Sequence, residues 1–160
     1  MPRSAMPPRR STSLRTSNSC RGTAVRDARS ALRIITNADR PNGRVLVDSL
    51  HAGRSTTTLA DLAAIPGSRL SYAQLCDAPG EVPTTQEGLI HTARCARLLP
   101  GEGGIDLVGI VRQLPSDLPL SLEIPNDERL PKLGAQEWAR QALAAAKRII
   151  ASSTCPQGAA

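Results

Sequence analysis

The chain has 160 residues, which is enough for one domain, and 40% of them are hydrophobic without any long apolar run. This composition excludes a membrane-spanning protein and favours a soluble core. The core must consist of aliphatic side chains, because the chain has no Phe, one Tyr and one Trp. So few aromatic rings also leave little surface for stacking on nucleic-acid bases.

Positive charge is concentrated at the N-terminal end. Residues 1–54 hold 11 Arg against three Asp, whereas residues 55–160 hold nine basic and eleven acidic side chains. We expect residues 1–27, which are rich in Arg, Ser and Pro, to form a disordered basic leader. A targeting segment is an alternative, although no apolar stretch follows the twin arginine at positions 9 and 10. A nucleic-acid-binding function of this Arg-rich end is a second alternative, and the scarcity of aromatic rings argues against it.

The four cysteines form neither a zinc motif nor a disulfide framework. They have irregular spacing and contain no CxxC pair: Cys20, Cys76, Cys95 and Cys155. Free thiols are typical of a reducing compartment, so we expect a cytoplasmic location.

Helix and strand patterns alternate along the rest of the chain. In order, the patterns predict a helix over 28–38, a strand over 45–51, a short helix over 58–65, a strand over 72–78, a long irregular segment over 79–103, a helix over 104–115, a strand over 120–126 and a helix over 135–151. We expect residues 152–160 to be a disordered tail. This order is typical of an α/β protein with a parallel sheet.

Each of the three predicted strands carries polar side chains at its downstream end. In parallel sheets, functional groups gather where a strand gives way to the following loop. The candidates for one shared site are therefore Asp48, His51, Gln74, Asp77, Glu123 and Asn126. A helix cap is the alternative role for Asp48, and we expect Asp77 and Asn126 to organise turns.

Three motifs resemble the sugar phosphate isomerase/epimerase family, whose members have a xylose isomerase-like TIM barrel and belong to the AP endonuclease family 2 superfamily. VLVDSLH is similar to the family's strand-end Asp-x-x-His, ARCARLLPGEGGIDL to its Arg-rich loop with a following Pro-Gly-Glu-Gly, and LSLEIPN to its final Glu-bearing strand. The resemblance covers residues 28–151. It implies the C-terminal part of a (β/α)8 barrel, with the last three βα units.

The same resemblance implies a divalent metal, Mn or Mg, at the carboxyl ends of the strands. It places metal ligands at Asp48, Gln74 and Glu123, and it makes Glu123 the catalytic carboxylate as well. Gln74 stands where the family has a His, and an amide oxygen suits Mg or Mn better than Zn. His51 and Arg97 resemble residues that bind the substrate.

The implied activity is the metal-dependent isomerisation or epimerisation of a small sugar, sugar phosphate or hydroxy-ketone. Such proton transfer requires a carboxylate base, an electrophile and a second acid-base group. The family's second carboxylate has no counterpart in this chain, so we expect a truncated protein with little turnover on its own. A further alternative is a non-catalytic half-barrel that self-associates through its open strand edges.

Overall fold

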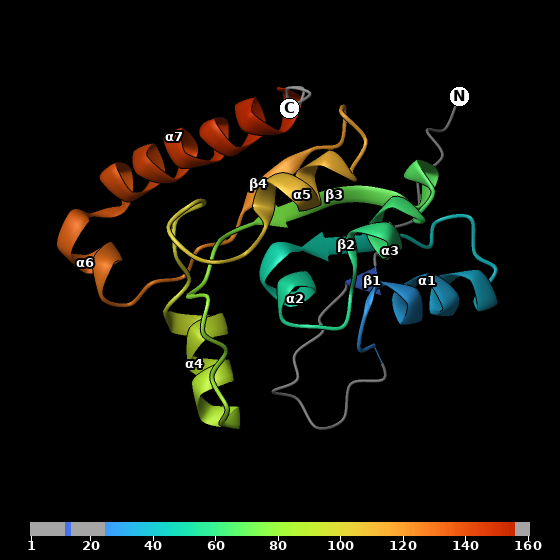
Figure 1. Ribbon diagram of the computed structural model, residues 1–160, viewed down its shortest axis with the longest axis horizontal. Coiled ribbons are helices and arrows are strands. Elements are labelled where there is room, and N and C mark those ends of the chain that lie inside the picture. Colours follow the sequence, from blue (N-terminus) through green and yellow to red (C-terminus); the bar gives the residue numbers. More distant parts are fainter. Residues whose placement is uncertain (1–11, 14–24, 156–160) are drawn as a thin grey trace, which may run out of the picture.

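The computed structural model describes residues 12–13 and 25–155 (Figure 1). Its elements are, in chain order, β1 (Thr12–Ser13), α1 (Ala28–Asn37), β2 (Val45–Asp48), α2 (Ser49–Gly53), α3 (Leu59–Ala63), the 3-10 turn η1 (Gly67–Arg69), β3 (Leu70–Leu75), α4 (Gln86–Cys95), α5 (Leu107–Arg112), β4 (Leu120–Leu122), α6 (Arg129–Leu133) and α7 (Ala135–Thr154). The predicted α/β architecture is confirmed.

The strands form one parallel sheet in the order β1-β2-β3-β4. Chain order and spatial order coincide, because each helical connection returns the chain to the next position along the sheet. The sequence patterns predicted β2, β3 and β4. They did not predict β1, which pairs with Val45 and Leu46.

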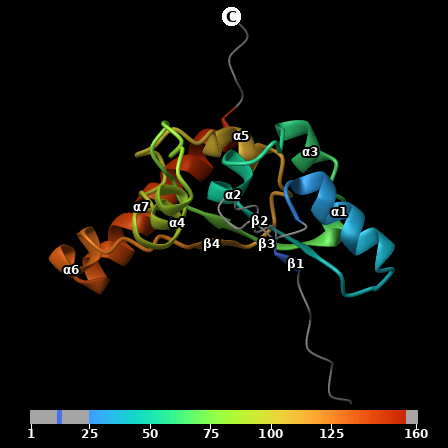
Figure 2. The same cartoon turned by 90° about the horizontal axis from the view of Figure 1, so that it is seen from below.

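Helices cover one face of this sheet. In Figure 2, α1, α2, α3, α4, α5 and α7 lie on the same side of the strands, and α6 lies beyond β4 at the far left. This is the arrangement of an incomplete TIM barrel, in which helices form the outer layer and the opposite face of the sheet lines the interior. Within the described residues, no helix is long and apolar enough to cross a membrane. The cytoplasmic location stays a prediction.

The hydrophobic core lies between the sheet and the helices and has two parts. In the first part, Val45, Val47 and Ala73 of the sheet pack against helical side chains that include Ile35 and Leu62. In the second part, small residues of α7 and the ring of Trp138 pack around Cys76 and Leu99. Aliphatic and alanine side chains therefore fill the core, as the composition predicted.

Several elements differ from their predicted bounds. The first strand ends at Asp48 rather than at residue 51, because the Asp48 side chain caps α2. The segment predicted to be irregular contains α4, which Thr85 caps, and α6 precedes α7. Helix α7 continues to Thr154, beyond the predicted end at Ala151. Its last carbonyl groups accept hydrogen bonds from the Arg112 guanidinium, which stabilises a helix C-terminus.

Most of the expected leader, residues 1–27, and the end of the expected tail lie outside the described residues. The disorder of the leader, its targeting role and its nucleic-acid contact therefore stay predictions. Two parts of the leader are exceptions: β1, whose two residues the structure places in the sheet, and residues 25–27, where Val25 packs against the core and Asp27 caps α1.

Candidate active site

The strand register brings the three predicted metal ligands to one edge of the sheet. Asp48 at the end of β2 is the Cα partner of Gln74 on β3, and Gln74 is the partner of Ser121 on β4. Glu123 follows two residues after Ser121, and its backbone N–H donates to the Leu75 carbonyl at 3.3 Å. Because side chains at partnered positions of parallel strands point to the same face, the ligand set shares one face of the sheet.

Each carboxylate oxygen of Asp48 accepts a hydrogen bond from another part of the protein. Its Oδ1 accepts a hydrogen bond from the His51 backbone N–H at 3.1 Å, which caps α2. Its Oδ2 accepts from Arg97 Nη1 at 2.8 Å. Asp48 therefore caps a helix, which was its alternative role in the sequence analysis. It is also one half of a buried ion pair.

Arg97 is the central side chain of the site. It lies just after α4 and is buried, although the sequence suggested a substrate contact in a basic loop. Its Nη1 is 3.6 Å from Glu123 Oε2, 3.2 Å from the Glu123 carbonyl oxygen and 3.3 Å from Cys76 Sγ. Burial opposes the charged form most strongly, but Asp48, Cys76 and Glu123 together outweigh it and raise the pKa of Arg97.

The other two predicted site residues are half-buried. Gln74 makes no hydrogen bond through its side-chain amide to any residue that the structure describes, so its amide oxygen is available as a ligand. His51 lies on α2, one helical turn beyond Asp48. Glu123 is the more accessible of the two carboxylates, with 41% of its side chain exposed against 2% for Asp48.

The donor chemistry fits a hard divalent cation. Two carboxylates and an amide oxygen are the ligands that Mg²⁺ and Mn²⁺ prefer. Among the described residues, no group of three His, Cys, Asp or Glu side chains lies close enough to hold a metal ion. A metal ion bound here would depend on the amide of Gln74 as third ligand.

Two residues that the sequence assigned to turns position the loops around the site. Asp77 is buried, and its carboxylate accepts hydrogen bonds from the backbone N–H groups of Ala78, Gly101, Gly103 and Ile105 at 2.8 to 3.1 Å. Asn126 donates from Nδ2 to the Arg97 carbonyl at 2.9 Å. Asp77 thus fixes the Pro-Gly-Glu-Gly loop, and Asn126 fixes the backbone of Arg97.

Cys76 is a structural thiol. Its sulfur is buried beside Arg97, and the hydroxyl of Ser49 donates to the Cys76 carbonyl at 2.7 Å. Burial, together with the nearby Asp48 carboxylate, raises the pKa of the Cys76 thiol to about 11. The thiol is therefore neutral at physiological pH and is not a nucleophile.

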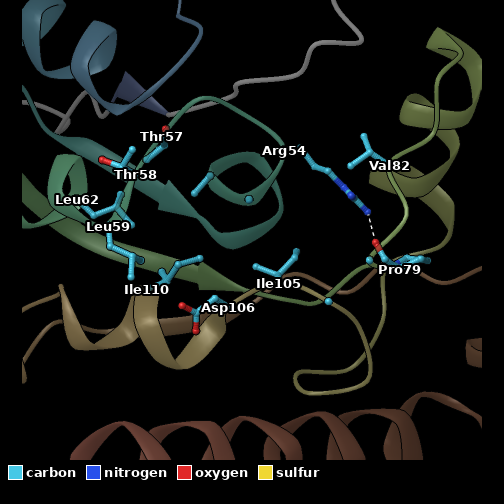
Figure 3. Close-up of a pocket in the computed structure, with 14 residues that line it drawn as sticks. Arg54, Thr57, Thr58, Leu59, Leu62, Pro79, Val82, Ile105, Asp106 and Ile110 are labelled. Atoms are coloured by element: carbon cyan, nitrogen blue, oxygen red, sulfur yellow. Dashed lines mark hydrogen bonds between the residues drawn. The ribbon is translucent and has the colours of Figure 1, made fainter.

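A cleft of about 400 Å³ lies elsewhere, between α3, α5 and the loop that follows β3 (Figure 3). Leu59, Leu62 and Ile110 line it, and Arg54 extends along it to donate a hydrogen bond to the Pro79 carbonyl. None of the predicted metal ligands lines this cleft. It is therefore separate from the candidate site.

Known enzymes share sequence with this chain. No protein-family model matches it. It is 29% identical over 109 residues to a 3-dehydroshikimate dehydratase of Pseudomonas aeruginosa, and 30% identical over 97 residues to one of Pseudomonas putida. These matches cover 66% and 59% of this chain but only 17% and 15% of the relatives. The chain thus spans less than a fifth of the length of these curated relatives.

Solved structures show the same fold. The IolI protein with a bound zinc atom matches with a TM-score of 0.67 at 20% identity, over 81% of this chain and 45% of IolI. A xylose isomerase domain protein from Alicyclobacillus acidocaldarius matches with a TM-score of 0.65 at 26% identity, over 82% and 45% of the two chains. A fusion of a xylose isomerase-like TIM barrel with 4-hydroxyphenylpyruvate dioxygenase matches with a TM-score of 0.57 at 28% identity, over 64% of this chain and 16% of the fusion protein.

The class that the fold and these comparisons define is the xylose isomerase-like TIM barrel, of which the described chain forms a part. The resemblance of the sequence motifs to xylose isomerase-like TIM barrels is thereby confirmed. The roles of Asp48, His51, Gln74, Arg97 and Glu123 stay predictions, as does the choice of Mn or Mg, since the metal in the IolI structure is zinc.

Proposed function

We propose that this chain supplies part of a metal-assisted active site that removes a proton next to a carbonyl group, and that the reaction is the dehydration of 3-dehydroshikimate. The observation that carries the proposal is the strand register, which brings Asp48, Gln74 and Glu123 to one edge of the sheet. The choice of reaction is supported by two curated relatives, which are both 3-dehydroshikimate dehydratases. The substrate is a hydroxy-ketone, the class that the sequence motifs imply.

Dehydration of such a ketone begins like isomerisation. A base removes the proton from the carbon next to the carbonyl, and the electron pair of the broken C–H bond moves toward the ketone. The C–O bond at the following carbon then breaks, and the hydroxyl group leaves with a proton as water. A bound divalent cation would supply positive charge to the ketone oxygen.

The residues of this chain have distinct roles in the proposal. Asp48, Gln74 and Glu123 would hold the cation, and Glu123 is the group that we expect to take up the proton, because it is the more accessible of the two carboxylates. His51 lies one turn beyond Asp48, and we expect it to donate a hydrogen bond to a substrate oxygen. A second carboxylate for returning the proton has to come from outside the described residues.

The second candidate is isomerisation or epimerisation of a small sugar, sugar phosphate or hydroxy-ketone. It is favoured by the 26% identity and TM-score of 0.65 to a xylose isomerase domain protein. Both reactions share the first proton transfer, and they differ in whether a hydroxyl group leaves. The product therefore separates them.

The test combines metal binding with product analysis. We expect calorimetry to show Mn²⁺ binding that is at least tenfold weaker in Gln74→Met, because this change removes the amide oxygen. It breaks no hydrogen bond to another described residue. Gln136→Met, at an exposed position of α7, is the matched control. With Mn²⁺ bound, 3-dehydroshikimate should yield an aromatic dihydroxybenzoate, which ultraviolet absorption detects.

Turnover should be small in this chain alone and should vanish in Glu123→Gln. If the protein converts a ketose from a panel of sugars but forms no aromatic product from 3-dehydroshikimate, the isomerase candidate is favoured. Equal Mn²⁺ binding by the wild type and Gln74→Met would remove the ligand assignment. Binding of neither Mn²⁺ nor Mg²⁺ would refute a metal-assisted function.

A further inference from the structure

Arg97 places a positive charge between the two carboxylates of the candidate metal site. Its Nη1 atom is 2.8 Å from Asp48 Oδ2 and 3.6 Å from Glu123 Oε2. The Arg97 and Asp48 side chains are both almost completely buried. A guanidinium in this position neutralises the negative charge that a metal ion would otherwise neutralise.

The charges of the described ligand set are not matched to a divalent cation while Arg97 is in place. Asp48 and Glu123 are two anions, Arg97 is one cation and Gln74 is neutral, so the set has one net negative charge. A divalent cation added to this set would leave an excess positive charge in a largely buried place, which is unfavourable. Removal of the guanidinium from the carboxylates restores the match.

We propose that Arg97 is the counter-cation of the metal-free site, and that a divalent cation binds by displacing the Arg97 guanidinium from Asp48 and Glu123. The inference rests on the proposed function, because it concerns the same ligands. The guanidinium has an anchor that does not involve them, since its Nε donates to the Ala93 carbonyl at 2.8 Å. The side chain therefore remains attached to the end of α4 when Nη1 leaves the carboxylates.

The alternative role for Arg97 is to hold Asp48 in the orientation that binds metal. The two roles predict opposite effects of removing the charge. A positioning arginine strengthens metal binding, so its loss weakens the affinity. A competing arginine weakens metal binding, so its loss strengthens the affinity, because a like charge a few ångströms from a cation is strongly repulsive outside bulk water.

The experiment measures Mn²⁺ affinity by calorimetry and thermal unfolding for the wild type, Arg97→Met and Arg94→Met. Arg94 is an exposed arginine in the last turn of α4, three residues before Arg97, so it controls for general charge. We expect Arg97→Met to bind Mn²⁺ about tenfold more tightly than the wild type. We also expect a lower melting temperature without metal and a larger rise with Mn²⁺, whereas Arg94→Met should match the wild type. Equal or weaker binding by Arg97→Met overturns the proposal.

A second measurement follows the wild-type chain and does not depend on Arg97→Met. Mg²⁺ is titrated into the wild-type chain while nuclear magnetic resonance follows the arginine side-chain N–H signals, with Arg97→Lys used for assignment. We expect the Nη signals of Arg97 to lose their protection from solvent exchange as Mg²⁺ binds, while its Nε signal persists. Protected Nη signals at saturating Mg²⁺ would overturn the displacement.

Failure of this inference is distinguishable from failure of the proposed function. If the wild type binds Mn²⁺ and Arg97→Met binds it equally or less tightly, the metal site stands and the displacement is wrong. If neither protein binds Mn²⁺ or Mg²⁺, both the displacement and the metal-assisted function are wrong.

Discussion

At the scale of a single residue, Asp77 shows how one buried carboxylate can organise a loop. It follows β3 directly, and it accepts backbone hydrogen bonds from both its own neighbour and the glycine-rich segment near residue 103. Gly103 is required there, because an added Cβ would overlap the Ala78 carbonyl oxygen and the Asp77 carboxylate. The Pro-Gly-Glu-Gly motif is therefore explained by packing against Asp77.

We expect Asp77→Asn to destabilise the fold by about 2 kcal/mol or more, because a carboxylate that accepts backbone N–H groups is replaced by an amide with one acceptor atom. Urea unfolding followed by circular dichroism measures the change. Asp117→Asn is the control, since Asp117 is exposed. An unfolding free energy within 0.5 kcal/mol of the wild type for Asp77→Asn, a range that is ordinary for surface changes, would show that the loop does not depend on this carboxylate.

At the scale of an element, α3 is a five-residue helix that depends on its cap. Thr58 and Asp61 form a capping box, in which each side chain accepts a hydrogen bond from the backbone N–H of the other. Arg29 of α1 also binds the Asp61 carboxylate. The Thr58 backbone N–H and the Arg29 guanidinium together lower the pKa of Asp61 to about 2.

This shift predicts a pH dependence of stability. Because the folded-state pKa of Asp61 lies below its ordinary value of 3.8, its stabilising contribution is present above 3.8 and is lost as the pH falls toward 2. Asp61→Asn should therefore melt at a lower temperature than the wild type at neutral pH. The difference should shrink as the pH falls from about 4 to about 2. A melting-temperature difference that stays constant over this range would contradict the assignment.

At the scale of the whole molecule, the main feature is the uncovered side of the sheet. All described helices that pack on the sheet lie on one face, and β4 is an edge strand without a described partner on its outer side (Figure 2). Its Leu122 is 36% exposed. An edge with unpaired backbone groups and an apolar side chain is a surface on which another strand can pair.

We expect the 16.9 kDa chain to self-associate through this edge, with an equilibrium that sedimentation velocity resolves over a range of concentrations. Leu122→Lys should shift the equilibrium toward monomer, because a lysine on an edge strand disfavours pairing. Leu143→Lys is the matched control, since Leu143 is 52% exposed on α7. A monomer at every concentration, or an equal effect of both lysines, would argue against pairing at β4.

Local patterns in the sequence were sufficient for the fold class and for gathering the candidate site residues, whereas their prediction as metal ligands came from the family resemblance. Asp48 ends β2, Gln74 is the last residue but one of β3, and Glu123 directly follows β4. Parallel strands bring such positions together without further information. The motifs also identified the barrel class. Helix α4 was missed, because proline and glycine surround it and only Thr92 of its residues is buried, so its hydrophobic pattern is weak.

The contacts within the site were decided only by the tertiary structure. Arg97 is 49 residues from Asp48 in the chain, and no spacing rule indicates that its guanidinium lies between that carboxylate and Glu123. The pairing depends on how the loop after α4 returns to the sheet, where Asn126 binds the Arg97 backbone. Periodicity reports which face of an element is buried, but the partner of a buried charge is set by long-range packing.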